Sequence, residues 1–190
     1  LIDIIKENTY KKMLDIGTGT GAIAITANLE NIAESVDAID IDINALKIAK
    51  RNQQKFKTSK VHFFKMDILK AIPDLKYDIV VSNPPYVSFE EYRQLNSEVK
   101  EHEPIHAITD FQDGLTFYKR YAIILKEILK PNGLIFFEVP NCPKDYFDGR
   151  PYDSPHLLFY TKKSFEKIAS LNSFKILNFS FSSYSFNEDH

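Results

Sequence analysis

The sequence predicts an α/β protein built on a mostly parallel β-sheet, and three local patterns lead to this fold class. The apolar run 77–82 stops at Asn83-Pro84-Pro85-Tyr86, where neither proline could donate a hydrogen bond to a neighbouring strand. A shorter run at 12–16 is followed at once by a glycine-rich turn and a helical pattern over 17–29. A third run, 35–39, ends in Asp40. Such buried runs, alternating with helices, are typical of parallel sheets, whose carboxyl ends form the edge where ligands bind.

Composition and charge narrow the class of protein further. The chain has 190 residues, of which 44% are hydrophobic, and this suits one domain with a full core. A formal net charge of −2 argues against a protein that grips long nucleic acid by charge alone. The single cysteine excludes an internal disulfide and a cysteine zinc site, and no apolar run approaches the roughly 20 residues of a membrane span. We therefore expect one cytoplasmic domain over 1–190.

The glycine-rich turn Gly17-Thr18-Gly19-Thr20-Gly21 predicts a cradle for a nucleotide or cofactor. Glycines allow the backbone to approach a ligand, and the first N–H groups of the following helix, Ala22–Leu29, face it. The spacing of Gly17, Gly19 and Ala22 also satisfies the dinucleotide fingerprint, so a nicotinamide-dependent oxidoreductase stays open here. A purely structural turn is the third alternative.

Acidic residues end the next two predicted strands. Asp40 lies about 20 residues beyond the glycine turn, where an acidic side chain can accept both ribose hydroxyls of either cofactor class. Asp67 follows the run 61–66 and can accept a hydrogen bond from an exocyclic adenine amine while Ile68 packs on the ring. Alternatively, Asp67 begins a loop turn. Asp42 is predicted to cap the helix that follows it.

Six cations populate that helix and the linker after it, and a solvated helix face explains them at least as well as an RNA-binding patch. They are Lys47, Lys50, Arg51, Lys55, Lys57 and Lys60.

Four strand ends in order, carrying the glycine turn, Asp40, Asp67 and Asn83, resemble class I S-adenosylmethionine-dependent methyltransferases. Within that superfamily, residues 13–138 most resemble the HemK-type release-factor glutamine methyltransferases. The matching segments are Leu14 to Ala24, Val81 to Val87, Glu103-Pro104 with Ala107, Asp113-Gly114-Leu115 and Phe117-Tyr118. The chain departs from the family at Asp110-Phe111, where two glycines are usual, and this leaves the conformation of that loop open.

The resemblance implies a three-layer fold with helices on both faces of a seven-stranded, mostly parallel sheet and an antiparallel C-terminal strand. It implies S-adenosylmethionine as the cofactor, and no metal, because the sulfonium already carries the leaving group. The implied cofactor-binding residues are Asp15, Gly17, Thr18, Gly19, Thr20, Gly21, Asp40, Asp67, Ile68 and Asn83. The implied catalytic residues are Asn83, Pro84 and Tyr86, and the implied substrate-binding residues are Asn83, Pro84, Pro85, Tyr86 and Glu103.

The resemblance weakens after a turn at 130–133 and a predicted strand at 134–139. A Pro-containing loop over 140–156 replaces the family pattern, and a helix near 162–171 and a hairpin from Phe174 are expected to follow, as in small-molecule methyltransferases. His156 is interpreted either as a substrate contact or as a histidine satisfied by backbone groups where a strand begins.

The motif Asn83-Pro84-Pro85-Tyr86 suits the methylation of a planar nitrogen, which is a poor nucleophile because its lone pair is delocalised. The Asn83 side-chain oxygen and the Pro84 carbonyl can accept its two N–H bonds while Tyr86 stacks on the planar group, which positions the nitrogen and stabilises developing charge.

The resemblance therefore implies methyl transfer to a protein glutamine, that of Gly-Gly-Gln in a peptide-chain release factor. An exocyclic amine of DNA or RNA is the alternative acceptor. An inactive cofactor-binding subunit is the other alternative, because the chain begins at Leu1 inside an amphipathic pattern and we expect an N-terminal docking module to be missing.

Overall fold

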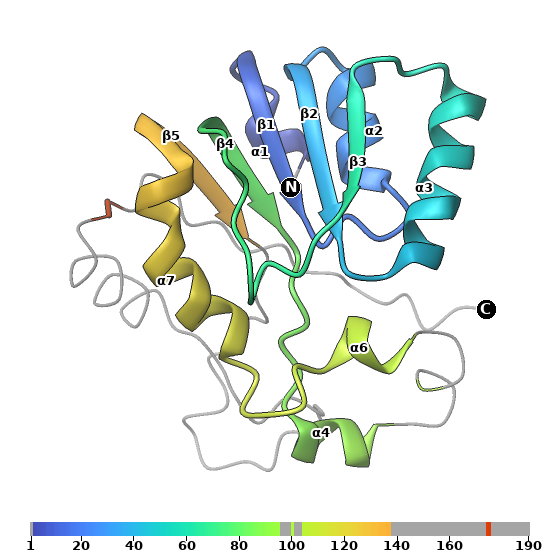
Figure 1. Cartoon of the computed structure of the whole chain (residues 1–190), viewed down its shortest axis with the longest axis vertical. Coiled ribbons are helices and arrows are strands. Elements are labelled where there is room, and N and C mark those ends of the chain that lie inside the picture. The colour runs from blue at the N-terminus through green and yellow to red at the C-terminus, as the bar shows by residue number, and fades with distance from the viewer. Residues whose placement is uncertain (1, 96–99, 101–103, 138–173, 176–190) are drawn as a thin grey trace, which may run out of the picture. The chain divides into compact units, whose positions relative to one another are not determined.

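A computed structural model describes residues 2–95, 100, 104–137 and 174–175. The strands it describes form one sheet of five parallel strands in the order β3-β2-β1-β4-β5 (Figure 1). The strands are β1 (Tyr10–Ile16), β2 (Ala33–Asp40), β3 (Val61–Lys65), β4 (Tyr77–Ser82) and β5 (Leu129–Phe137). The helices are α1 (Ile2–Ile5), α2 (Ala22–Leu29), α3 (Ile43–Phe56), α4 (Phe89–Gln94), α6 (Ile105–Ile108) and α7 (Thr116–Ile128).

The register of β1 with its two neighbours aligns three strand ends. Ile16 lies opposite Ile39 of β2 on one side and opposite Ser82 of β4 on the other. The residues that follow these three begin the glycine turn, end β2 at Asp40 and open the Asn83 motif. The strand order reverses between β1 and β4, and a reversal of this kind is where open α/β sheets bind ligands.

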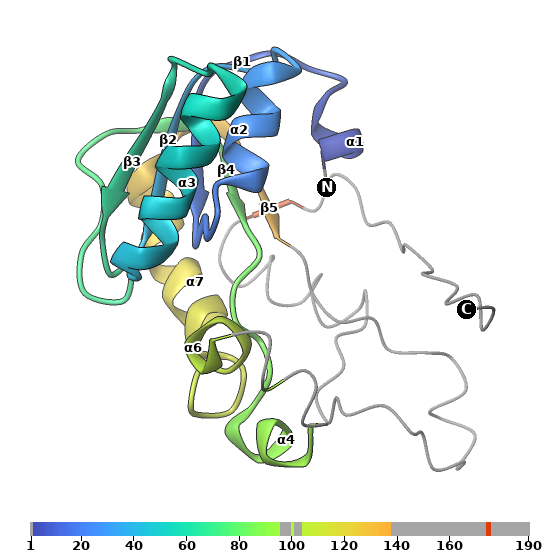
Figure 2. The ribbon, with the colours of Figure 1, turned by 90° about the vertical axis from the view of Figure 1, so that its right-hand side faces the viewer.

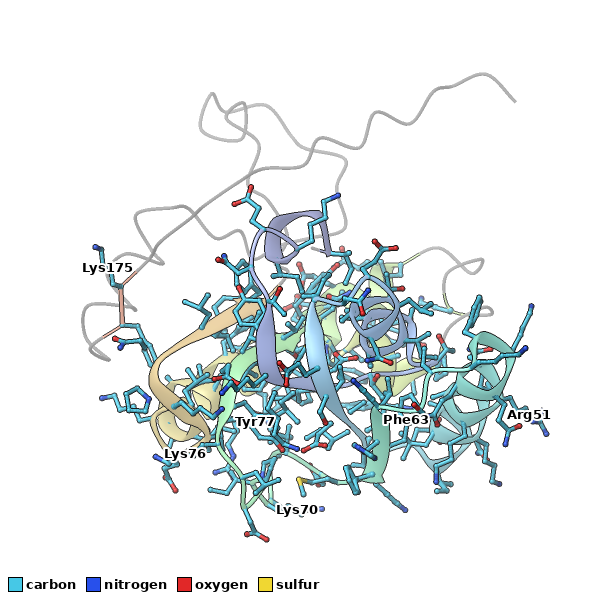
Figure 3. All side chains as sticks on the ribbon, turned by 90° about the horizontal axis from the view of Figure 1, so that it is seen from above. Arg51, Phe63, Lys70, Lys76, Tyr77 and Lys175 are labelled. Atoms are coloured by element: carbon cyan, nitrogen blue, oxygen red, sulfur yellow. The ribbon has the colours of Figure 1, made fainter. Side chains whose placement is uncertain are left out.

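Helices cover both faces of the sheet. α2 and α3 pack on one face and α7 on the other (Figure 2). The core of the first face contains apolar side chains from β1, β2, β3 and β4, and it closes against Ala24, Ile25, Leu46 and Ala49 of the two helices. Phe63 lies in this face, whereas Arg51 lies on the exposed side of α3 (Figure 3).

Local capping explains where α3 begins and ends. The Asp42 side chain accepts a hydrogen bond from the Asn44 N–H at 2.8 Å, which confirms the predicted cap. Lys57 ends the helix in the left-handed conformation, with φ 56°, and its N–H bonds back to the last turn.

The start of β5 differs from the sequence prediction. The strand begins at Leu129, and the expected turn at 130–133 is a bulge inside it: Leu129 pairs with Tyr77, and pairing resumes between Leu134 and Ile79. Pro131 has no N–H to give to the ladder, and Asn132 adopts φ 63°, so the chain leaves the sheet and returns.

The stretch after Tyr86 forms regular elements: it contains α4, α6 and α7. α7 buries Tyr121, Ile124, Leu125 and Ile128, a spacing that places them on one side of a helix. α4 begins with a capping box in which Ser88 and Glu91 each accept the other's backbone N–H.

Several predicted elements lie outside the described residues. These are the sixth and seventh strands, the loop 140–156 with His156, and the helix 162–171; of the hairpin from Phe174, only Phe174 and Lys175 are described, in no regular element. Within the described part of the chain, none of the helices has the length and apolar character to cross a bilayer.

Candidate active site

The glycine turn is held in a shape that L-residues with side chains rarely adopt. Gly17, Gly19 and Gly21 have φ values of 74°, 55° and 82°. A Cβ atom on Gly17 or Gly19 would meet nothing within 4 Å, so the backbone of these two residues is open to a ligand. A Cβ atom on Gly21 would lie 2.9 Å from the Phe63 ring, so this glycine serves close packing of the turn on β3.

Asp40 ties the end of β2 to the glycine turn. Its Oδ2 accepts a hydrogen bond from the Gly19 N–H at 2.7 Å, and its Oδ1 accepts one from the Asp42 N–H at 2.8 Å. Each carboxylate oxygen has a second lone pair, so both can still accept a bond from a ligand hydroxyl. The position predicted to contact ribose therefore lies directly beside the open glycine backbone.

Asp15 and Thr18 support the turn from inside the protein. Both side chains are buried, and the Thr18 hydroxyl donates to Asp15 Oδ2 at 2.7 Å. Burial raises the pKa of Asp15 to about 6, although the bond from Thr18 opposes this shift. Thr20 is exposed, and its carbonyl accepts from the Asn52 side chain at 3.0 Å.

Asp67 and Ile68 form a turn after β3. Asp67 Oδ1 accepts the Leu69 N–H at 3.0 Å, and Oδ2 lies 3.0 Å from the Lys70 ammonium. These are the contacts expected if Asp67 begins a loop turn. Ile68 is buried, and its carbonyl oxygen accepts a bond from the Arg120 Nε–H at 2.9 Å. The contact of these residues with adenine stays a prediction.

The Asn83 motif presents its polar residue to solvent. Asn83 is exposed, Pro84 is buried, and Pro85 and Tyr86 are half-buried. The segment 108–114 packs against the motif, because the Val87 N–H donates to the Ile108 carbonyl at 3.2 Å. A Cβ atom on Gly114 would lie 2.4 Å from the Tyr86 carbonyl oxygen, so only glycine fits there. Glu103, the other predicted substrate contact, lies outside the described residues.

Asp110 organises the loop in which the chain departs from the family pattern. Its carboxylate accepts three backbone N–H bonds, from Gln112 at 2.8 Å, Gly114 at 3.0 Å and Thr116 at 3.0 Å. The last of these satisfies the first residue of α7. Phe111 adopts φ 60°, which costs an L-residue about 1–2 kcal/mol where glycine would be relaxed.

The structure brings most of the predicted site residues to one edge of the sheet and adds residues that the sequence did not indicate. The glycine turn, Asp40 and Asn83 follow aligned strand ends. The added residues are Asp110, Arg120 and Tyr121, and the 3.6-residue period of α7 was the one signal that pointed to the last of them. Within the described residues, no group of three His, Cys, Asp or Glu side chains is arranged to hold a metal ion.

The raised pKa of Asp15 predicts that this one group contributes more to the stability of the protein in weak acid than at neutral pH. The unfolded chain loses this proton near pH 3.8 and the folded chain near pH 6, so stability from this group falls as pH rises across that window. The full effect is about 3 kcal/mol, at 1.36 kcal/mol for each pH unit. Urea unfolding at pH 4 to 7 should show that Asp15→Asn lacks this decline. Parallel pH profiles for the two proteins would contradict the assignment.

Gly114→Ala should destabilise the protein far more than Gly19→Ala. Both glycines have positive φ, 77° and 55°, but only at Gly114 would the new Cβ atom strike a backbone oxygen. We expect Gly19→Ala to lower the free energy of unfolding by about 1–2 kcal/mol, and Gly114→Ala by more than about 3 kcal/mol. Chemical denaturation measures both, and equal losses would show that the Tyr86 contact is not restrictive.

Comparison with known proteins places this geometry in a family. Residues 1–101 match the family described as the methyltransferase small domain. The chain is 42% identical over 138 residues to the release factor glutamine methyltransferase of Bacillus subtilis (strain 168), covering 72% of this chain and 48% of that protein. It is also 42% identical over 139 residues to the Fusobacterium nucleatum protein of the same name, covering 73% of this chain and 39% of the relative.

A solved structure supports the fold. The ribosomal protein L11 methylase from Lactobacillus delbrueckii subsp. bulgaricus superimposes with a TM-score of 0.60 at 19% identity, covering 96% of this chain and 69% of that one. The chain spans about half the length or less of the first two curated relatives, 48% and 39%. The strand order and the open glycine turn agree with these matches, and the chain belongs to the methyltransferase small domain family, with the α/β fold of class I methyltransferases.

Proposed function

We propose that the protein transfers a methyl group from S-adenosylmethionine to the side-chain amide nitrogen of a protein glutamine. The substrate we propose is the glutamine of Gly-Gly-Gln in a peptide-chain release factor. The observation that carries the proposal is the placement of exposed Asn83 next to the open glycine turn and Asp40, in a chain 42% identical to a release factor glutamine methyltransferase.

The residues on the β1 and β2 side suit the cofactor. The backbone of Gly17 and Gly19 is open, and Asp40 has acceptor capacity left for the two ribose hydroxyls. The buried pair Asp15 and Thr18 holds the turn in place. When bound, S-adenosylmethionine supplies an activated methyl group on a positively charged sulfur, with the leaving group already attached.

The residues on the β4 side suit the acceptor. An amide NH₂ group can donate two hydrogen bonds. The Asn83 side-chain oxygen can accept one of them and the Pro84 carbonyl oxygen the other. The two acceptors orient the nitrogen and favour the positive charge that grows on it as the methyl group is transferred. Pro84 is buried, its ring fixes its φ, and its ψ is restricted because Pro85 follows it, so its carbonyl is preorganised. Half-buried Tyr86 can lie over the planar amide.

We propose further that residues 1–190 act as one domain, with a seven-stranded sheet whose last strand is antiparallel and with substrate docking supplied by a separate N-terminal module. The described part supports this with its five parallel strands. The first two curated relatives are at least about twice as long as the segment they share with this chain.

A second candidate acceptor is an exocyclic amino group of DNA or RNA. All six cations of α3 and the linker after it are exposed, which favours contact with a phosphate backbone. A base within a duplex must first be flipped out at a cost of a few kcal/mol, whereas a glutamine in a glycine-flanked loop needs no such step. The formal net charge of −2 also favours the protein substrate.

Substitution of Asp40 and Asn83 should separate cofactor binding from methyl transfer. Asp40→Ala removes a charged acceptor for two hydroxyls, so we expect S-adenosylmethionine affinity to weaken by roughly 1–3 kcal/mol. Asn83→Ala should lower kcat by about 100-fold while cofactor affinity changes less, because Asn83 acts mainly on the acceptor. Calorimetry and steady-state kinetics measure the two effects. Equal loss of binding and turnover in Asn83→Ala would make Asn83 a cofactor residue instead.

The acceptor can be identified with labelled cofactor. This chain, and in parallel a longer protein that contains it, is incubated with release factor, with its Gln→Ala variant, and with undermethylated DNA and RNA. We expect label in the release factor only, at the Gly-Gly-Gln glutamine, with weaker labelling by the isolated chain. Label in nucleic acid, or equal label in the Gln→Ala variant, would replace the glutamine assignment with the amino-base alternative.

A further inference from the structure

Two adjacent side chains of α7 reach different parts of the candidate active site. Tyr121 is buried, and its hydroxyl lies 2.7 Å from Oγ of Ser82, the last residue of β4. Arg120 donates from Nε to the Ile68 carbonyl at 2.9 Å, in the turn after β3. One helix therefore contacts both the strand that delivers Asn83 and the turn predicted to contact adenine.

The hydrogen bonds of Ser82 have a defined direction. Its hydroxyl has one proton, which it donates to the Ile16 carbonyl oxygen at 2.9 Å. Tyr121 must therefore donate to Ser82 Oγ. Burial, and the nearby charge of Asp15, raise the pKa of Tyr121, so its phenol keeps its proton at neutral pH. The result is a buried chain of bonds from α7 through β4 to β1.

This chain of bonds ends at the two residues that precede the open parts of the site. Ser82 comes directly before Asn83, and Ile16 comes directly before Gly17. Pro84 and Pro85 have no N–H, so neither can donate a ladder bond. The position of Asn83 therefore depends on how Ser82 is fixed on one side and on the bond from the Val87 N–H to the Ile108 carbonyl on the other. A displacement of about 1 Å at a reacting group can cost on the order of 100-fold in rate.

We propose that α7 positions both sides of this site, with Tyr121 holding Asn83 through Ser82 and Arg120 holding the turn at Ile68. The inference rests on the proposed function, which gives these two places their roles. Tyr121 and Arg120 are positioning residues, since each acts through another residue and neither is assigned a contact with a reacting atom.

The protein contains a matched control for Tyr121 on the same sheet. Tyr77 is also buried, and its hydroxyl donates to a buried carboxylate, Asp37 Oδ2, at 2.9 Å. It is the first residue of β4, whereas Ser82 is the last, so it lies at the opposite end of the strand from Asn83. Loss of either hydroxyl removes one buried hydrogen bond, but only Tyr121 should affect the position of Asn83.

Three variants of the protein are compared in the release-factor assay and in cofactor titrations. Tyr121→Phe should lower kcat about threefold to tenfold with cofactor Kd within about twofold of wild type. Arg120→Met should show the reverse, a cofactor Kd raised about threefold to tenfold and kcat at saturating cofactor nearly unchanged. Tyr77→Phe should change neither constant. A merely structural role would not lower kcat in one variant and weaken cofactor binding in the other. Equal kcat values in Tyr121→Phe and Tyr77→Phe would overturn the inference.

Hydrogen exchange of the ligand-free proteins tests positioning without any activity. Tyr121→Phe should speed exchange of the amides within 82–87, which are those of Ser82, Asn83, Tyr86 and Val87, and Tyr77→Phe should leave them unchanged. Unchanged exchange across 82–87 in Tyr121→Phe would overturn the inference whatever the substrate. If wild-type protein fails to methylate release factor but Tyr121→Phe still speeds this exchange, the proposed function is wrong and the positioning of Asn83 by Tyr121 stands.

Discussion

The central constraint on this protein is the register of β1 with two parallel neighbours at once. Ile16 must lie opposite both Ile39 and Ser82, and a slip of one residue would turn the buried side chains of β1 to the wrong face. With that register fixed, three segments that are distant in sequence end at the same level. The glycine turn, Asp40 and Asn83 owe their closeness to this ladder more than to any contact among their side chains.

Buried polar groups stabilise that edge from both faces of the sheet. On the α2 face, Asp15 and Thr18 bond to each other beneath the glycine turn. On the α7 face, Ser82 bonds to Tyr121 and to the backbone of β1. A buried polar group that loses its hydrogen-bond partner costs the protein folding free energy. These buried bonds therefore hold the glycine turn and the start of the Asn83 motif firmly at the ends of their strands. The surface that faces a ligand can then consist of open backbone and an exposed amide.

Sequence reasoning succeeded where the signal is local. The bounds of α2 and β4, the cap at Asp42 and the polar ends of the strands follow from neighbouring residues, and the structure has them as predicted. It failed where a residue's role depends on a distant partner. Ser82 and Tyr121 are 39 positions apart, and Ile68 and Arg120 are 52 apart, so neither contact can be read before the fold is known.

Asp67 shows a different limit of sequence reasoning. A strand-end acid reads equally well as a ligand contact or as the first residue of a turn, and the described contacts of Asp67 with Leu69 and Lys70 are those of a turn. The same ambiguity affected the bulge in β5, where a proline and an asparagine predicted the change of direction but not its place inside a strand. Local chemistry identifies such turns, and tertiary pairing decides which strand they interrupt.

The three backbone hydrogen bonds accepted by Asp110 decide whether the loop that follows it loses its conformational entropy on folding or on binding. Two glycines at this place would leave the loop many conformations, and a substrate that docked there would have to order it at a cost of about 1–2 kcal/mol for each residue. Here the carboxylate orders the segment from Gln112 to Thr116 during folding, and the strained Phe111 is held within the same loop. The loop beside the Asn83 motif is thus already shaped before anything binds to it, and its conformational entropy is lost when the chain folds.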